Sequence, residues 1–201
     1  MAFITGYVSL PVDSYDSFKN AVLGNGYDAD GSYGDQCWDL TAELWHNVGF
    51  PTGYPHTGAN HYASECWTAS REANTSYNGV EYFDLIYNLS DIKKGDVIVW
   101  NGSTQYPAGH IALADEDYNG TGSIKVLGQN QGSSGTPTPI PNPQGGTTAN
   151  VASVGTINFL GAFRYKEWHV TPPPTPDTKS NFKWVLYARK LNNRRNSRNM
   201  I

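Results

Sequence analysis

Five short runs rich in β-branched and aromatic residues follow one another after Gly95, each bounded by turn-forming residues. Such runs are typical of β-strands, and their close spacing favours antiparallel pairing. They cover residues 96–100, 110–114, 123–127, 151–157 and 159–165. Apolar residues at helical spacing are concentrated before them, at 13–23, 37–46 and 59–72. We therefore expect an α+β fold, with N-terminal helices packed on a central antiparallel sheet.

The charge is unevenly distributed along the chain. Residues 1–170 carry 7 Lys and Arg against 17 Asp and Glu, whereas residues 171–201 carry 7 against 1. The sequence TPPPTP at 171–176 predicts a semi-rigid polyproline spacer between the two parts. We therefore predict an acidic folded domain at 1–170, a Pro-rich linker at 171–176 and a basic tail at 177–201.

Several classes of protein are disfavoured by the sequence. We see no secretory signal at residues 1–10 and no run that is long and apolar enough to span a bilayer. Two cysteines, Cys37 and Cys66, are too few for a disulfide scaffold. The basic tail carries no nucleic-acid recognition motif, so we expect no nucleic-acid partner.

Cys37 stands at the predicted start of the second helix, within the sequence G-D-Q-C-W-D. A helix N-terminus lowers the pKa of a thiol, because its unpaired amides favour the thiolate. Cys37 is therefore a candidate nucleophile, and the alternative is a buried structural cysteine. Cys66 lies inside the third predicted helix without such a context, so we expect it to be structural.

His110 provides a candidate general base for that nucleophile. It opens an apolar strand in G-H-I-A-L, beside a glycine that lets another backbone approach closely. The next predicted strand is followed by G-Q-N-Q-G at 128–132, where Asn130 is available to hydrogen-bond the imidazole and fix its tautomer. Taken alone, a polar turn of this kind is simply a turn.

An acidic segment lies immediately before Cys37. Oxygen-bearing residues occupy positions 1, 3, 5, 7, 9 and 12 of an EF-hand-type loop, namely Asp28, Asp30, Ser32, Gly34, Gln36 and Asp39. Position 6 is Tyr33 instead of glycine, and position 12 is aspartate instead of glutamate. The geometry must therefore differ from that of a true EF-hand, and the alternative is an Asp- and Gly-rich turn.

In combination, these segments resemble the CHAP family, the cysteine, histidine-dependent amidohydrolases/peptidases. The resemblance rests on ordered motifs within 15–168, namely G-x-Q-C-x-D at 34–39, G-A-N at 58–60, K-K-G-D-V-I-V-W at 93–100, G-H-I-A-L at 109–113 and Q-N at 129–130. It implies a papain-like fold related to the NlpC/P60 group. It also implies cleavage of amide bonds in bacterial peptidoglycan by a Cys-His mechanism.

The resemblance implies a role for each matched residue. Cys37 is expected to be the nucleophile and His110 the base, and Gln36 assists the oxyanion hole by analogy with papain-like enzymes. Asn130 is expected to orient the histidine, with Gln129 as the alternative. Many relatives carry glutamate where this chain has Gly128, so we expect a thiolate-imidazolium pair that rests on an amide.

Calcium is the cofactor that the resemblance implies. In calcium-dependent CHAP endolysins the ion is held by carboxylates that match Asp28, Asp30 and Asp39. Ser32 and Gly34 are expected to contribute main-chain carbonyl oxygens. The ion would have a structural role and brace the loop that presents Cys37.

The expected protein is a phage endolysin or virion-associated lysin, made in the host cytoplasm and released to the cell wall through a holin or carried on the particle. The bond cut is either the N-acetylmuramoyl-L-alanine amide or a peptide bond of the stem or cross-bridge. The basic tail is expected to contact an anionic wall polymer or a membrane, unless it docks on the acidic domain or is disordered. The alternative is a non-catalytic wall-binding or virion structural protein, which would be free to lose Cys37 and His110.

Overall fold

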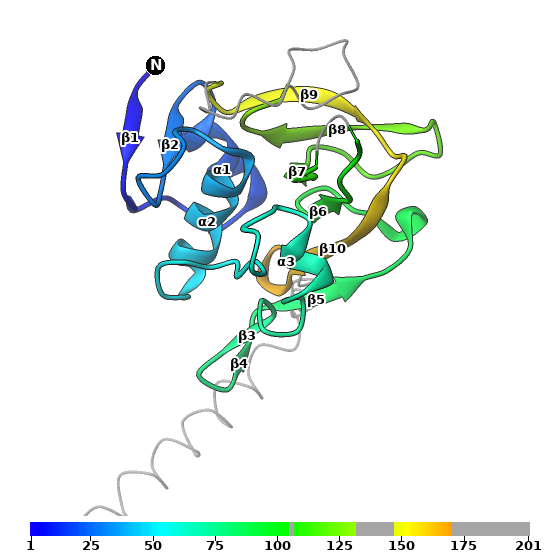
Figure 1. Cartoon of the computed structure of the whole chain (residues 1–201), viewed down its shortest axis with the longest axis horizontal. Coiled ribbons are helices and arrows are strands. Elements are labelled where there is room, and N and C mark those ends of the chain that lie inside the picture. The colour runs from blue at the N-terminus through cyan, green and yellow to red at the C-terminus, as the bar shows by residue number, and fades with distance from the viewer. Residues whose placement is uncertain (105–106, 132–146, 170–201) are drawn as a thin grey trace, which may run out of the picture. The chain divides into compact units, whose positions relative to one another are not determined.

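The computed structural model describes residues 1–104, 107–131 and 147–169, which belong to one unit, Met1–His169. The predicted linker at 171–176 and the basic tail at 177–201 lie outside the described residues. Within the described part, six strands form one antiparallel sheet in the order β5-β10-β6-β7-β8-β9 (Figure 1). They are β5 (Phe83–Ile86), β6 (Val97–Trp100), β7 (His110–Ala114), β8 (Ser123–Gly128), β9 (Asn150–Gly155) and β10 (Phe159–Tyr165). The expected α+β class is confirmed, and only β5 of these six strands was not predicted.

Two helices match the sequence expectation, and the third is much shorter than expected. The helices are α1 (Tyr15–Val22), α2 (Cys37–Val48), α3 (Glu65–Thr68) and the 3-10 turns η1 (Leu89–Asp91) and η2 (Lys166–His169). The prediction of a helix over 59–72 is wrong, because His61 has a φ of 58° and the Glu65 carboxylate accepts the amides of Asn60 and Tyr62. Among the described residues, no helix is long and apolar enough to cross a membrane.

Two small sheets complete the secondary structure. β1 (Phe3–Thr5) runs parallel to β2 (Gly26–Asp28), which leads directly into the acidic segment. β3 (Ser76–Tyr77) and β4 (Val80–Glu81) form a hairpin whose turn residues, Asn78 and Gly79, both have positive φ. Asn-Gly is the preferred pair for such a turn.

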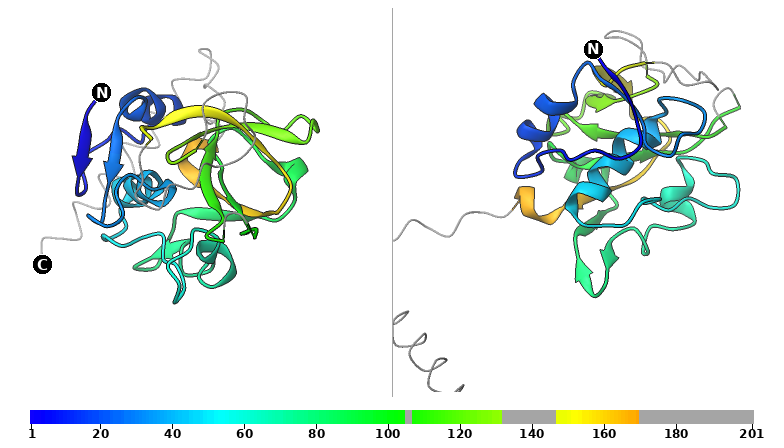
Figure 2. Two further views of the ribbon diagram at one scale, coloured as in Figure 1. Left: turned by 45° about the horizontal axis from the view of Figure 1, so that its top comes forward. Right: turned by 90° about the vertical axis from the view of Figure 1, so that its left-hand side faces the viewer.

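The central strands of the large sheet, β6 and β7, are buried on both faces, which explains why they lack an apolar and polar alternation. In β6, Val97 and Val99 face a core shared with the helices, while Ile98 and Trp100 belong to a second apolar cluster. The sheet is strongly curved, and α1 and α2 lie on one side of it (Figure 2). Packing of α2 against β7 brings the first turn of the helix to the start of that strand.

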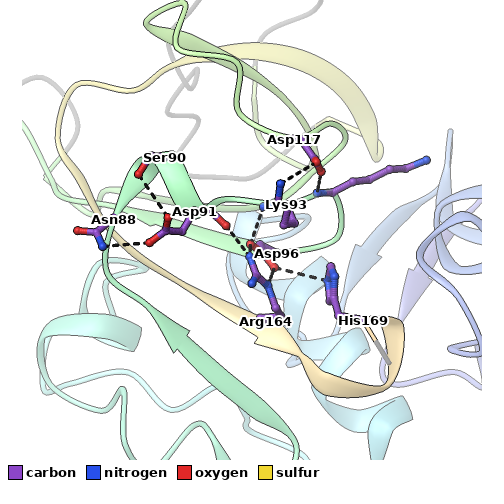
Figure 3. A network of polar contacts seen from close by, with 9 residues as sticks. Asn88, Ser90, Asp91, Lys93, Asp96, Asp117, Arg164 and His169 are labelled. Atoms are coloured by element: carbon purple, nitrogen blue, oxygen red, sulfur yellow. Dashed lines mark hydrogen bonds and ion pairs between the residues drawn. The ribbon is translucent and has the colours of Figure 1, made fainter. Parts of the chain in front are cut away.

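A buried ion pair ties β6 to β10. Asp96 has no exposed surface, and its two carboxylate oxygens accept hydrogen bonds from Nε and Nη2 of Arg164 at 2.8 and 2.7 Å (Figure 3). The main-chain amide of Lys93 also donates to Asp96, and Nη2 of Arg164 donates to the Asp91 carbonyl. Nε2 of His169 lies 3.6 Å from Asp96, so the last described residue belongs to the same network.

Substitution of Arg164 by leucine should be strongly destabilising, because it leaves the buried Asp96 carboxylate without its cation. We expect a loss of about 3–5 kcal/mol in the free energy of unfolding, measured by urea denaturation. Lys166→Met is the matched control, since Lys166 pairs with the exposed Glu81 and Asp84 and its replacement should change the free energy of unfolding far less. Equal losses in the two variants would contradict this role of the buried pair.

Candidate active site

Cys37 is the first residue of α2 and lies against the start of β7. It is a free, partly buried thiol, and the main-chain amide of Ile111 donates to its sulfur. Ile111 directly follows His110, so the thiol stands beside the histidine's own strand segment. Cys66 is also a free thiol but is fully buried in the helix-side core, which agrees with its expected structural place.

Burial governs the protonation of both groups. It raises the pKa of Cys37 to about 11, although the amides of Ile111, Trp38 and Cys37 itself act in the opposite direction. Burial also lowers the pKa of His110 to about 4. At neutral pH the groups are therefore a thiol and a neutral imidazole. The expected thiolate-imidazolium pair stays a prediction, because burial and the amides at the helix N-terminus act on the Cys37 pKa in opposite directions.

His110 is the first residue of β7 and is almost completely buried. Its cross-strand partner is Trp100, and the two ring centroids are 5.6 Å apart. Gly109 has a φ of 70°, and a β-carbon added there would collide with the Trp100 carbonyl oxygen. The glycine therefore permits the close backbone approach that the sequence indicated.

The turn after β8 presents three amide side chains with different sets of hydrogen-bond partners. Gln129 accepts the Tyr27 amide and donates to the Tyr27 carbonyl, both at 2.9 Å, so it binds β2. Asn130 donates to Oε1 of Gln36 at 2.7 Å. Gln131 is the residue that contacts His110, with 3.0 Å between Oε1 and Nε2.

Gln131 is thus a further candidate for orienting the histidine, beside Asn130 and Gln129, whose expected role stays a prediction. The φ of 49° at Asn130 turns the chain between the two glutamines, and the Asn130 carboxamide nitrogen donates to Gln36 ahead of α2. Sequence reasoning missed Gln131 because it considered only the first two residues of Q-N-Q. The third amide-bearing residue in that turn was the available signal.

Gln36 precedes α2 and is engaged through both ends of its carboxamide. Nε2 donates to the Tyr33 carbonyl at 2.8 Å, and Oε1 accepts from Asn130. Its contribution to an oxyanion hole stays a prediction. The main-chain amides at the start of α2 point out of the helix N-terminus, where they can stabilise developing negative charge.

The three carboxylates of the acidic segment come together at the end of β2. Asp28, Asp30 and Asp39 each offer an oxygen, and these oxygens lie within 4.8 Å of one another. Oδ1 of Asp28 is buried without a hydrogen-bond partner among the described residues. Tyr33, at the position where an EF-hand has glycine, has a φ of 65°, so the loop keeps the left-handed residue that such a turn needs.

The surroundings of the carboxylates fit a hard cation. Asp39 accepts the amides of Ala29 and Gln36, and Asp30 accepts that of Ser32. Burial, together with the charges of Asp30 and Asp28, raises the pKa of Asp39 to about 8. When ionised, the three carboxylates repel one another, and a bound Ca²⁺ would neutralise their negative charge. Ser32 and Gly34 lie in the intervening loop, and their carbonyl contributions stay predictions.

Comparison with known proteins adds a family and several relatives. The model of the CHAP domain matches residues 24–130. Over 123 residues the chain is 37% identical to the D-alanyl-L-alanine endopeptidase of Streptococcus phage B30, covering 59% of this chain and 25% of that protein. It is 28% identical to endolysin PlyTW of Staphylococcus phage Twort over 123 residues, covering 60% and 24%. The chain thus spans about a quarter of the length of these relatives.

A solved structure supports the fold. The crystal structure of the wild-type endolysin LysIME-EF1 matches with a TM-score of 0.56 at 24% identity, covering 78% of this chain and 64% of that chain. At this identity the likeness concerns the arrangement of the backbone. It agrees with the α+β fold that the sequence predicted.

Proposed function

Since this chain belongs to the CHAP domain family, we propose that it is a peptidoglycan hydrolase that cleaves an amide bond with Cys37 and His110. The observation that carries the proposal is the meeting of α2 and β7. The thiol at the helix N-terminus receives the amide of Ile111, and the adjacent His110 has its Nε2 engaged by Gln131. Thiol-dependent acyl transfer requires a nucleophile, a base and a group that orients the imidazole of the base.

The proposed reaction begins with a neutral pair. His110 takes the proton of the Cys37 thiol as the sulfur attacks the carbonyl carbon of the scissile amide. Main-chain amides at the start of α2 stabilise the oxyanion, and the imidazolium then protonates the leaving amine as the carbon-nitrogen bond breaks. Water, deprotonated by His110, attacks the resulting thioester, which releases the carboxylate product and restores the thiol.

The relative with 37% identity is named as a D-alanyl-L-alanine endopeptidase, and this favours an endopeptidase for the present chain as well. An N-acetylmuramoyl-L-alanine amidase is the other candidate. Both enzymes free the amino group of an L-alanine, and they differ in the carboxyl group that they free, which belongs to D-alanine for the endopeptidase and to the lactyl group of the glycan for the amidase. Relatives from two phages support action as a phage endolysin or virion-associated lysin, which reaches the wall through a holin or on the particle.

The proposal also includes a metal ion and a contact surface for the basic tail. Asp28, Asp30 and Asp39 would hold a structural Ca²⁺, supported by the close approach of their oxygens and by the unpartnered, buried Oδ1 of Asp28. When bound, the ion would brace the loop between β2 and Cys37. The basic residues of 177–201 would contact an anionic wall polymer or membrane, which rests on their charge.

Substitution of Cys37 by alanine tests the enzymatic proposal. We expect it to lower the release of new amino groups from purified Gram-positive cell walls by roughly 10³-fold or more, because no other nucleophile replaces the thiol. Cys66→Ala is the matched control and should keep its activity within a few-fold. Mass spectrometry of the fragments should identify a new D-alanine carboxyl terminus together with the new alanine amino terminus, which shows that a peptide bond was cut.

Two results would count against this account. If Cys37→Ala cleaves as fast as the wild-type protein, Cys37 is not the nucleophile. If the wild-type protein binds walls but releases no fragments, a non-catalytic wall-binding or virion structural role is favoured. Fragments carrying a free lactyl carboxylate on the glycan would instead identify an amidase.

Calcium binding should appear as thermal stabilisation. We expect saturating Ca²⁺ to raise the Tm of the wild-type protein by roughly 5–10 °C, and a chelator to reverse the shift, because the ion binds the folded state only. Asp28→Asn should remove most of the response. Asp16→Asn is the control, since Asp16 is an exposed carboxylate that pairs with Lys94 and does not belong to the cluster of Asp28, Asp30 and Asp39. If neither calcium nor chelator changes the Tm of the wild-type protein, the metal site is refuted.

A further inference from the structure

We propose that Gln131 is the positioning residue of the site: it holds His110 in the tautomer with the proton on Nε2, which leaves Nδ1 as the base. The inference rests on the proposed function, since a base is needed only if Cys37 acts as a nucleophile. Oε1 of Gln131 lies 3.0 Å from Nε2 of His110, and both side chains are about 1% exposed. The contact is therefore protected from competing water.

The direction of the Gln131 carboxamide is fixed by its nitrogen. Nε2 of Gln131 donates to the Val126 carbonyl at 3.2 Å and to the Asn150 carbonyl at 3.0 Å. A carbonyl oxygen can only accept, so these contacts require the NH₂ group at that end and the oxygen at the other. The group that faces His110 is thus an acceptor, and Nε2 of the imidazole must be the donor.

The same contacts explain why this position carries an amide and not a carboxylate. A glutamate at 131 would direct one oxygen to His110 and the other to the carbonyls of Val126 and Asn150. An ionised oxygen beside two buried carbonyl oxygens is unfavourable. Glutamine satisfies an acceptor role and a donor role with one rigid group.

Gly128 supplies the space that the Gln131 carboxamide occupies. A β-carbon added at Gly128 would lie 2.5 Å from Oε1 of Gln131 and 3.0 Å from the β-carbon of Ala112. The backbone of Gly128 is outside the left-handed region, so alanine is permitted there by conformation. The Gln131 carboxamide can therefore occupy its position only because residue 128 has no side chain.

Removal of the acceptor should disturb both the tautomer and the basicity of His110. The hydrogen bond from Nε2 raises the histidine pKa against the effect of burial, so its loss should lower that pKa further. Without a fixed partner, the imidazole proton distributes between Nδ1 and Nε2. In the fraction with the proton on Nδ1, that nitrogen can no longer accept the proton of the thiol.

The test compares Gln131→Met and Gly128→Ala with the wild-type full chain. Nitrogen-15 NMR of the imidazole should give an Nε2-protonated ring in the wild-type protein and a tautomer mixture in both variants. The kcat on cell-wall fragments should fall roughly 10- to 100-fold while KM stays within about two-fold. Gly128→Ala retains the Gln131 side chain, so it keeps the test open if Gln131→Met folds poorly.

Val151→Ala is the control for stability alone, since Val151 pairs with Leu127 between β8 and β9 and packs against the helix-side core. It should lower Tm and leave the tautomer and kcat unchanged. The proposal is overturned if Gln131→Met keeps the wild-type tautomer, or if Val151→Ala reduces kcat equally. If the tautomer shifts as expected but the wild-type protein cuts no peptidoglycan, the positioning role stands and the proposed function fails.

Discussion

The burial of α2 against β7 is the contact on which the candidate site depends. Leu40 and Leu44 share a core with Ile111, and this packing fixes the first turn of the helix beside the first residue of the strand. Cys37 and His110 are those terminal residues. The hydrophobic contact that stabilises the fold thus also sets the Cys37 thiol beside the main chain of Ile111, the residue after His110, on rigid elements that can maintain catalytic geometry.

The turn at 129–131 connects this contact to the rest of the site. Gln129 binds the main chain of β2, Asn130 binds Gln36 ahead of α2, and Gln131 binds His110 on β7. β2 leads into the carboxylate cluster, and Asp39 of that cluster accepts the amide of Gln36. A cation on the carboxylates and the orientation of the base would therefore be linked through short hydrogen bonds, of which those at Gln36 are partly buried and the one at His110 is buried.

The sequence predicted what local patterns encode. β-Branched runs located five strands, and helical spacing located α1 and α2, which already places Cys37 and His110 at element starts. Other features were not predicted: β1 pairs with β2 across more than twenty residues, and local hydrogen bonds from the amides of Asn60 and Tyr62 to the Glu65 carboxylate interrupt the expected third helix. Gln131 was missed because only the first two residues of Q-N-Q were considered, and its contact with His110 joins residues that are 21 positions apart in the chain.

Trapping of the covalent intermediate tests the central claim most directly. The account predicts that wild-type protein, quenched in acid after mixing with peptidoglycan fragments, carries a thioester adduct detectable by intact-protein mass spectrometry and mapped to the peptide that contains Cys37. The adduct mass should equal the acyl half of the cleaved bond. Fragment release without any adduct on Cys37, or with an adduct on Cys66, would contradict the account.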